Sequence, residues 1–239
     1  MIYVGLPVHD ERHTVGVLMW RIRKEMVRED QDFRMVVVDD GSTDGTAEVL
    51  EPYRRILPLK VLSHDRSRGY SACLERIVRL ALDDSGYHKR DALLTLEADF
   101  THDPAAIPEM LRAFQSGADL VHGVPRERGA VPRAVRWARR LVSLAAGDLP
   151  LPDVVEAPFT GFRLHRLFVL RRILEELEEG EPMLRYDGWA ANAELLVKAL
   201  PHARQIEQIG FHLDYTRRYR DSRFRLLSEL WNVFRAGRD

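Results

Sequence analysis

The chain contains 239 residues, and its 36 lysines and arginines nearly balance 37 acidic residues to give a formal net charge of −1. This length provides an ample core for one large α/β domain or two small ones, and we favour one. The balanced charge excludes the overall basic character that is typical of proteins binding nucleic acid, so we expect no nucleic-acid partner.

Short apolar runs alternate with helical patterns in the first half of the chain. The runs at residues 2–6, 35–38, 59–62, 92–96 and 120–121 have the composition of buried strands. Helical spacing lies between them, as at residues 15–27 and 73–82. This alternation predicts an α/β fold built from right-handed βαβ units, with a mostly parallel central sheet flanked by helices.

The second half of the chain is less regular. Its expected elements are a basic helix at 132–146, a proline-rich loop at 150–158, a strand at 159–164, helices at 169–179 and 189–200, a strand at 205–215 and a tail helix from Phe224. No internal repeat, low-complexity segment or interdomain linker interrupts the pattern, so residues 1–239 are expected to form a single domain.

The cysteine count and the hydropathy pattern bear on the cellular compartment. The single cysteine, Cys73, looks structural, excludes an intrachain disulfide and favours a reducing cytoplasmic compartment. The N-terminal residues lack a basic region followed by a long apolar stretch, and no run approaches the ~20 apolar residues of a membrane span. We therefore expect a cytoplasmic protein that is soluble or peripheral at the cytoplasmic membrane face.

The second predicted strand ends abruptly in two acids within the sequence MVVVDDGSTDGT. Asp39 and Asp40 follow a β-branched run, and a glycine-rich turn separates them from a helix that Asp44 or Thr46 is suited to cap. The carboxyl edge of an open α/β sheet is where ligands bind, so the two acids are candidates for contacts to a base, a ribose or a cation. The structural alternative is that they only stabilise the turn and the helix dipole.

A second strand also ends in acids, within LLTLEADFTHDP. Glu97 and Asp99 are separated by one residue, a spacing that allows both carboxylates to hold one divalent cation, directly or through water. A solvated turn explains the pair equally well. Asp103 precedes Pro104 and is better interpreted as a helix N-cap with proline at the first helical position.

Arginine is concentrated in the second half of the chain. Residues 126–140 contain six arginines against one acid, Glu127, and the tail from Arg217 is also basic. These are candidate anion sites, because the guanidinium fork suits phosphate. A solvated helix face is the alternative. The apolar residues between the arginines of 133–146 favour core packing or an interfacial helix.

The order of these segments resembles that of the inverting family 2 glycosyltransferases with a GT-A fold, and within them the dolichol-phosphate or polyprenyl-phosphate mannosyltransferases. The segments that carry the resemblance are LPVHDE (family LPTYNE), VVVDDGSTDGT, DRSRGYSACL, LEADFTHDP (family DADLxHPP), RWARRLVS (family WRRxVS), FTGFRLHR (family SGFR), YDGWAANAELLVKA and residues 206–224. The resemblance covers nearly the whole chain. It implies a nucleotide-sugar-binding half at 1–125 and an acceptor-binding half at 126–239.

The resemblance implies roles for individual residues of the first half. Contacts to the donor nucleotide are implied for Pro7, His9, Glu11, Asp39, Asp40, Arg68 and Ala98. Of the two adjacent acids, Asp40 is expected to contact the nucleoside, and Asp39 is also a candidate structural partner of the turn. Asp99 takes the place of the metal-binding second acid of the family's D-x-D, and Glu97 that of the first. Glu97 departs from the family's aspartate by one methylene, so its metal geometry is expected to differ. The implied cofactor is Mg²⁺ or Mn²⁺.

Arginines of the second half match the family's phosphate-handling segments. Arg139 and Arg140 occupy the WRRxVS pair and are expected to act in catalysis together with Asp99. Phosphate or acceptor contacts are implied for Arg126, Arg128, Arg163, Arg217, Arg218 and Arg223.

The implied reaction is transfer of a hexose, mannose or glucose, from a GDP-mannose or UDP-glucose type donor to a polyprenyl monophosphate, with inversion and peripheral membrane contact. A phosphate monoester has a second pKa of about 6, so this acceptor needs no general base. One alternative is a hydroxyl acceptor, small metabolite or polysaccharide, for which Asp187 or Glu194 is the available base. A nucleotide-binding protein that has lost catalysis is another alternative.

Overall fold

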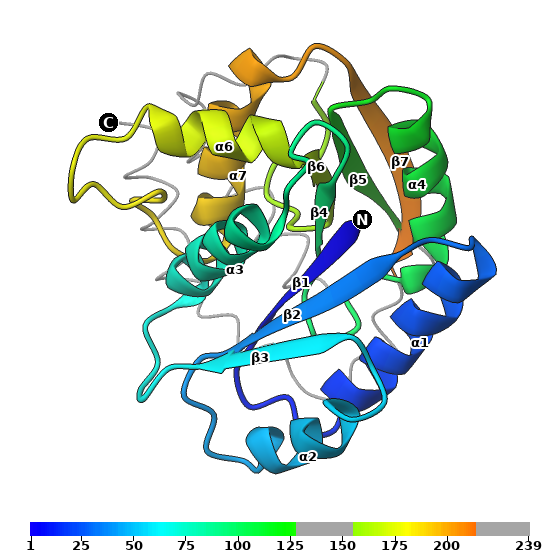
Figure 1. Ribbon diagram of the computed structural model, residues 1–239, viewed down its shortest axis with the longest axis vertical. Helices are drawn as coiled ribbons and strands as arrows, with labels where there is room; N and C mark the ends of the chain where they lie inside the picture. The colour runs from blue at the N-terminus through cyan, green and yellow to red at the C-terminus, as the bar shows by residue number, and fades with distance from the viewer. Residues whose placement is uncertain (128–154, 214–239) are drawn as a thin grey trace.

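A computed structural model describes residues 1–127 and 155–213, which form one α/β domain around a seven-stranded sheet (Figure 1). The strands are β1 (Ile2–Val8), β2 (Phe33–Asp39), β3 (Leu59–Ser63), β4 (Ala92–Thr95), β5 (Leu120–Glu127), β6 (Arg163–Arg166) and β7 (Ile206–Leu213). Their order across the sheet is β3-β2-β1-β4-β6-β5-β7. Neighbouring strands are parallel except at β6, which runs antiparallel to both β4 and β5.

The helices connect the strands and cover both faces of the sheet. They are α1 (Val15–Arg28), α2 (Thr46–Tyr53), α3 (Tyr70–Asp84), α4 (Ile107–Gln115), α6 (Leu167–Glu175) and α7 (Gly188–Ala199), with short 3₁₀ turns η1 (Pro104–Ala106) and η2 (Leu200–His202). Helix α1 shows why they form: Leu18, Ile22 and Met26 recur at a spacing of four and are all fully buried.

Two apolar clusters lie on opposite faces of the sheet because side chains alternate along a strand. On β2, Met35 and Val37 join the cluster covered by α1 and α4, whereas Val36 and Val38 join the cluster covered by α3, α6 and α7. Figure 1 shows these two groups of helices on either side of the sheet. Burial on both faces explains the continuous apolar run of this strand.

Most predicted elements are confirmed, with bounds shifted by a few residues. The predicted helices at 15–27 and 73–82 are α1 and α3, and the predicted helix at 169–179 begins earlier and ends at Glu175. The strand predicted at 159–164 begins only at Arg163 and reverses the sheet direction. The basic helix expected at 132–146 and the tail helix from Phe224 lie outside the described residues.

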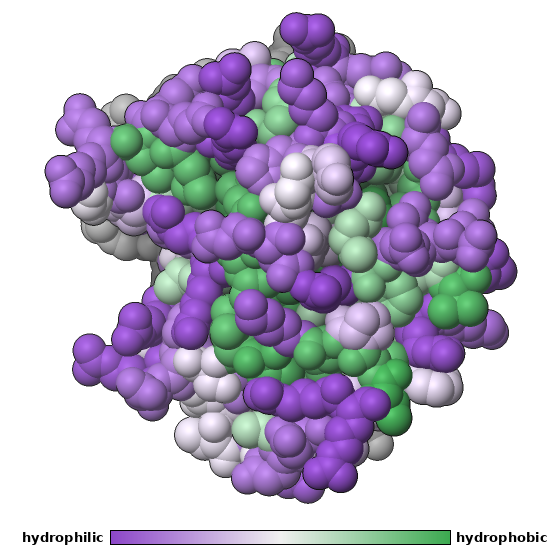
Figure 2. Space-filling view, viewed as in Figure 1, coloured by the Kyte–Doolittle hydropathy of each residue, from purple (hydrophilic) through white to green (hydrophobic). Residues whose placement is uncertain are grey.

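The carboxyl ends of β1, β2, β3 and β4 meet at one edge of the sheet, so the loops that follow them lie there together. The antiparallel direction of β6 brings the residues before it to the same edge, because Arg163 pairs with Thr95 at the end of β4. The outline in Figure 2 is indented on the side where β2 and β3 end in Figure 1. Of the helices within the described residues, none is both long and apolar enough to cross a bilayer.

Candidate functional site

The loops after β1 and β2 are joined by hydrogen bonds into one structural unit. The Asp10 carboxylate accepts the amide hydrogen of Thr43 at 2.6 Å, and the Asp10 amide donates to Ser42 Oγ at 2.8 Å. The Glu11 amide donates to Thr46 Oγ1 at 2.8 Å. In the sequence, α1 and most of β2 separate the motifs LPVHDE and DDGSTDGT. The hydrogen bonds therefore join two distant motifs at the same edge of the sheet.

The sequence predicts that Asp44 or Thr46 caps α2, and Asp44 does bind the first turn, although it is not the N-cap residue. The N-cap position is Gly45, whose φ of 93° is in the left-handed region that favours glycine. Asp44 Oδ1 accepts the Thr46 amide at 3.0 Å, so the predicted contribution of Asp44 is made one residue before the cap.

Asp40 lies at the centre of the site and accepts four hydrogen bonds from the loop after β3. Its Oδ1 accepts from His64 Nδ1 at 2.7 Å and from the Arg68 amide at 2.8 Å. Its Oδ2 accepts from Ser67 Oγ at 2.6 Å and from the Gly69 amide at 3.0 Å. Burial alone raises the pKa of Asp40, but these hydrogen bonds outweigh burial, so the pKa is lowered and the carboxylate stays ionised.

The sequence predicts a nucleoside contact for Asp40 and allows a structural role for Asp39. The hydrogen bonds in the structure favour the opposite division of roles. Both oxygens of Asp40 are engaged within the protein, so its charge organises residues 64–69. Asp39 Oδ1 accepts the Ser42 amide at 3.0 Å, while Oδ2 accepts no hydrogen bond from the described part of the chain. Nucleotide contacts of Asp39 and Asp40 stay predictions, but Asp39 is the acid with an acceptor to spare.

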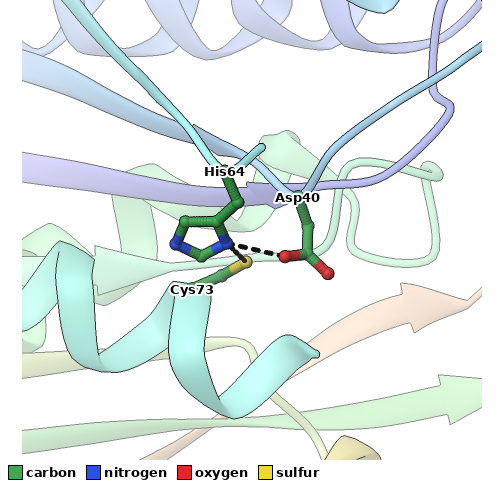
Figure 3. Close-up of side chains that lie close together, drawn as sticks. All are labelled: Asp40, His64 and Cys73. Carbon is green, nitrogen blue, oxygen red and sulfur yellow. Dashed lines mark hydrogen bonds and ion pairs between the residues drawn. The ribbon is translucent and has the colours of Figure 1, made fainter. Parts of the chain in front are cut away.

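Asp40, His64 and Cys73 form a buried group whose ligand atoms lie within 4.8 Å of one another (Figure 3). Within residues 1–127 and 155–213, this is the only group of three or more such side chains with the spacing of a possible metal site. Burial raises the pKa of the Cys73 thiol, which disfavours the thiolate that binds metal. The filled acceptors of Asp40 also favour a hydrogen-bonded core group, in which Cys73 is a buried free cysteine.

Glu97 and Asp99, the predicted metal ligands, lie half-buried in the turn that follows β4. Asp99 Oδ1 accepts the Thr101 amide at 2.8 Å, and the Glu97 amide donates to His102 Nδ1 at 3.0 Å. Phe100, which follows Asp99, has a φ of 63° in the left-handed region. Two carboxylates in one turn supply the oxygen ligands that Mg²⁺ and Mn²⁺ prefer, so the donor set fits a divalent cation.

The turn leads into a helix whose predicted cap is confirmed. Asp103 is the N-cap of η1, its Oδ1 accepts the Ala105 amide at 3.1 Å, and Pro104 is the first helical residue. The helical end of the loop is therefore anchored separately from the two predicted metal ligands.

Asp187, one of the two predicted bases, caps a helix that lies far from it in sequence. Its Oδ1 accepts the amide hydrogen of Ser71 in the first turn of α3 at 2.8 Å. A Cβ on Gly69 would lie 2.5 Å from Asp187 Oδ2, so glycine is required for this approach. Asp40 and Asp187 together neutralise the amide end of α3.

Glu194, the other predicted base, is engaged within the protein. Its Oε2 accepts the amides of Arg185 at 2.8 Å and Tyr186 at 3.1 Å. Its Oε1 forms an ion pair with Lys198 at 3.0 Å, and the residue is only 8% exposed. These contacts hold the start of α7 against the preceding loop.

Arg163 is fully buried, although the sequence analysis assigned it to phosphate or acceptor binding. Its Nε donates to His122 Nδ1 at 3.0 Å, and its two terminal nitrogens donate to the carbonyls of Asn192 and Pro158. Burial lowers the pKa of Arg163 to about 9, and burial followed by the charge of Arg163 lowers that of His122 to about 3. The phosphate contact finds no support here, because each nitrogen of the guanidinium is occupied inside the domain.

The remaining predicted residues lie partly within and partly outside the described part of the chain. Arg126 is exposed and forms a bidentate ion pair with Glu156, in which Nη1 lies 2.9 Å from Oε2 and Nη2 lies 3.2 Å from Oε1. Pro7 lies in β1, and His9 Nδ1 donates to the Asp40 carbonyl at 2.8 Å. The predicted residues outside the described part of the chain are Arg128, Arg139, Arg140, Arg217, Arg218 and Arg223.

Comparison with known proteins identifies the family. Residues 3–177 match the family model described as glycosyl transferase family 2. The chain belongs to this family.

Curated relatives of this family 2 chain include enzymes named for polyprenyl phosphates. The dolichol-phosphate mannosyltransferase of Pyrococcus furiosus is 28% identical over 202 residues, which are 82% of this chain and 52% of the relative. The undecaprenyl-phosphate 4-deoxy-4-formamido-L-arabinose transferase of Pseudomonas syringae is 27% identical over 148 residues, 60% of this chain and 41% of the relative. The chain thus spans about half the length of the curated relatives it matches.

Solved structures confirm the GT-A fold. Glucosyl-3-phosphoglycerate synthase of Mycobacterium tuberculosis superposes with a TM-score of 0.68 at 20% identity, covering 99% of this chain and 78% of the synthase. The synthase in complex with Mn²⁺, UDP-glucose and phosphoglyceric acid superposes with a TM-score of 0.65 at 22% identity, covering 98% and 76%. At this identity, the likeness establishes the architecture alone.

Sequence reasoning missed several residues that organise this family 2 site. His64 and Ser67 bind Asp40, and His102 binds the Glu97 amide and faces Thr160 Oγ1. His64 and Ser67 lie in the loop after β3, and β3 pairs in parallel with β2, which ends next to Asp40. The pairing of these two predicted strands was therefore the available signal. His102 matches the histidine of the family's DADLxHPP segment, and that match was the available signal, although its contact with Thr160 comes from a distant segment.

Proposed function

We propose that this chain transfers a hexose from a nucleoside diphosphate sugar, with inversion, to a polyprenyl monophosphate. The observation that carries the proposal is how the two possible bases are held: both carboxylate oxygens of Glu194 are occupied, and Oδ1 of Asp187 is committed to the first turn of α3. Asp187 accepts the Ser71 amide, and Glu194 accepts two amides and pairs with Lys198. A polyprenyl phosphate is already nucleophilic near neutral pH and needs no base. The acceptors named for the curated relatives support the same chemistry.

The donor site is proposed at the joined loops after β1 and β2. The spare Oδ2 of Asp39 lies on the unit that also carries His9 and Glu11, and a ribose hydroxyl or a base nitrogen suits such an acceptor. Asp40 is proposed to shape the pocket through residues 64–69, which include Arg68. Ala98, between the two acids of the metal turn, completes the predicted nucleotide contacts.

Glu97 and Asp99 are proposed to hold Mg²⁺ or Mn²⁺. When bound, the cation would neutralise charge on the departing nucleoside diphosphate. Arg126 and the predicted arginines outside the described residues, Arg139 and Arg140 among them, are proposed to neutralise the phosphates of donor and acceptor. Because a polyprenyl phosphate is a membrane lipid, we propose that the protein makes peripheral contact with the cytoplasmic face of a membrane.

The acceptor class is tested by direct transfer. Purified protein is incubated with labelled GDP-mannose or UDP-glucose, Mn²⁺ or Mg²⁺, and either polyprenyl phosphate in detergent or phosphoglyceric acid. We expect label to enter the organic phase with the lipid acceptor. Label confined to the aqueous acceptor would instead favour a hydroxyl acceptor. Absence of both transfer and donor hydrolysis across a broad panel would indicate a nucleotide-binding protein without catalysis.

The Asp187→Asn variant tests the absence of a base. Its Oδ1 still accepts the Ser71 amide, so we expect lipid-directed transfer close to that of the wild type. A general base contributes about 10²–10⁴-fold to a rate. A collapse of this size at saturating donor, with nucleotide binding intact, would contradict the phosphate-acceptor proposal.

The Asp99→Ala variant tests the metal assignment. We expect transfer to fall by about 10²–10³-fold, as when one stabilising group is lost from the transition state. Asp103→Asn is the matched control, because it lies in the same loop and asparagine is an equally good N-cap. Near wild-type transfer by Asp99→Ala at limiting metal would show that the assignment is wrong.

A further inference from the structure

His102 is a buried side chain that packs against the aromatic rings of Phe162 and Phe211. It is only 2% exposed. Its ring stacks on Phe162 with centroids 5.2 Å apart and an interplanar angle of 15°. It meets Phe211 edge to face at 5.4 Å. Phe162 immediately precedes β6 and Phe211 lies in β7, so the ring joins the turn after β4 to the second half of the chain.

The hydrogen bonds of His102 define its tautomer. Nδ1 lies 3.0 Å from the backbone nitrogen of Glu97, which can only donate. Nδ1 is therefore an unprotonated acceptor, and the ring proton is on Nε2. Nε2 lies 3.2 Å from Thr160 Oγ1, which is then placed to accept that proton.

These contacts anchor the turn of Glu97 and Asp99 at the end opposite to its helical cap. The Asp99 carboxylate accepts the Thr101 amide inside the turn, and Asp103 caps η1 at the far end. At the other end, His102 Nδ1 accepts the Glu97 amide, next to a glutamate side chain that is longer than the family's aspartate. A rigid anchor on that backbone limits the positions open to the glutamate carboxylate.

We propose that His102 is a positioning residue that fixes the Glu97 backbone so that the carboxylates of Glu97 and Asp99 converge on one divalent cation. This inference rests on the proposed function, which assigns the cation to these two acids. Groups that orient metal ligands without touching the metal commonly change metal affinity by about 10–100-fold when they are replaced. Thr160 extends the same anchor to the segment before β6.

Two variants of His102 separate positioning from packing. In His102→Asn, Oδ1 occupies the place of Nδ1 and keeps an acceptor for the Glu97 amide. In His102→Gln, the side-chain amide reaches the place of Nε2 and leaves the Glu97 amide without that acceptor. Both variants lose the imidazole ring that packs against Phe162 and Phe211, so we expect a similar fall in melting temperature without metal.

The measurement is a Mn²⁺ titration with and without UDP or GDP. The electron paramagnetic resonance signal of free Mn²⁺ reports how much of the metal is bound. We expect His102→Asn to bind Mn²⁺ nearly as well as the wild type and His102→Gln to bind it about 10–100-fold more weakly. Equal affinities for the two variants would overturn the inference.

Asp99→Ala distinguishes this inference from the proposed function. Unchanged Mn²⁺ affinity in Asp99→Ala would mean that the cation site itself is misassigned. If Asp99→Ala loses affinity while His102→Gln keeps it, only the role of His102 is wrong. Should neither His102 variant fold, ¹⁵N spectra of the wild-type ring give the answer: an Nε2–H tautomer supports the inference, and a protonated Nδ1 overturns it.

Discussion

Asp40 shows how strongly one buried carboxylate can organise a site. Its four donors come from a loop more than twenty residues away, and the residue is 5% exposed. An exposed ion pair such as Arg171–Glu175, with side chains 56% and 39% exposed, is worth about 0–1 kcal/mol. Loss of Asp40 leaves several buried donors without a partner, and each such donor costs about 1–3 kcal/mol. We therefore regard Asp40 as the principal electrostatic anchor of this edge.

We predict that Asp40→Ala lowers the free energy of unfolding by about 3–5 kcal/mol at neutral pH, because the buried partners of a removed charge are left unpaired. Urea unfolding followed by circular dichroism measures the change. Asp65→Ala, an exposed aspartate in the same loop, is the control and should change stability little. Similar losses in the two variants would contradict the anchoring role.

The lowered pKa of Asp40 also predicts a pH dependence. A carboxyl whose pKa is lower in the folded state stabilises the fold above its unfolded pKa of about 3.9. That contribution is lost as the pH falls through the lower folded pKa. The stability difference between wild type and Asp40→Asn should therefore be constant near neutral pH and shrink below about pH 4. A difference that grows with acidification would exclude this origin.

Helix α3 illustrates how one element depends on residues from distant parts of the chain. Its N-terminal amides are occupied by Asp40 and Asp187 rather than left for a ligand. The N-cap, Gly69, has a φ of 96° and lies against the Asp187 carboxylate. The start of α3 thus fixes both the loop after β3 and the start of α7.

We predict that Gly69→Ala destabilises the protein by about 1–3 kcal/mol, because the backbone is left-handed there and the new Cβ would meet Asp187. Gly86→Ala is the matched control, since a Cβ at Gly86 meets no atom within 4 Å. Thermal or urea unfolding of both variants gives the comparison. A Gly69→Ala variant as stable as Gly86→Ala would show that the close approach is relieved at no cost.

At the scale of the whole molecule, strands from the predicted nucleotide-sugar-binding half and the predicted acceptor-binding half alternate within one sheet. The boundary between 1–125 and 126–239 falls inside β5, and β6 from the second half lies between β4 and β5. The described residues therefore form one continuous sheet, and the functional division predicted at residue 125 falls within one of its strands.

We predict a single unfolding transition for the full chain, with coincident midpoints by circular dichroism and tryptophan fluorescence. The fragment 1–125 should not fold cooperatively, because removing β6 and β7 leaves β5 without either of its neighbours. Two separate transitions, or a fragment with its own cooperative unfolding, would show instead that the halves are independent.

The sequence by itself determined the features that depend on local chemistry. Apolar periodicity and turn residues located most strands and helices, because burial imposes a period of two on strands and of 3.6 on helices. The acids at the ends of β2 and β4 were found for the same reason, since a strand end is visible in composition. The Asp103 cap, which spans only two residues, was likewise predictable.

Only the tertiary structure decided how the polar groups are partnered. Asp40 meets His64 across 24 residues, His102 meets Thr160 across 58, and Asp187 meets Ser71 across 116. The tertiary structure also reversed the direction of β6 and buried Arg163, for which the family resemblance implied a phosphate or acceptor contact. The physical reason is that a carboxylate or a ring nitrogen accepts from whichever donor the packing brings within about 3 Å, and no local period encodes that donor.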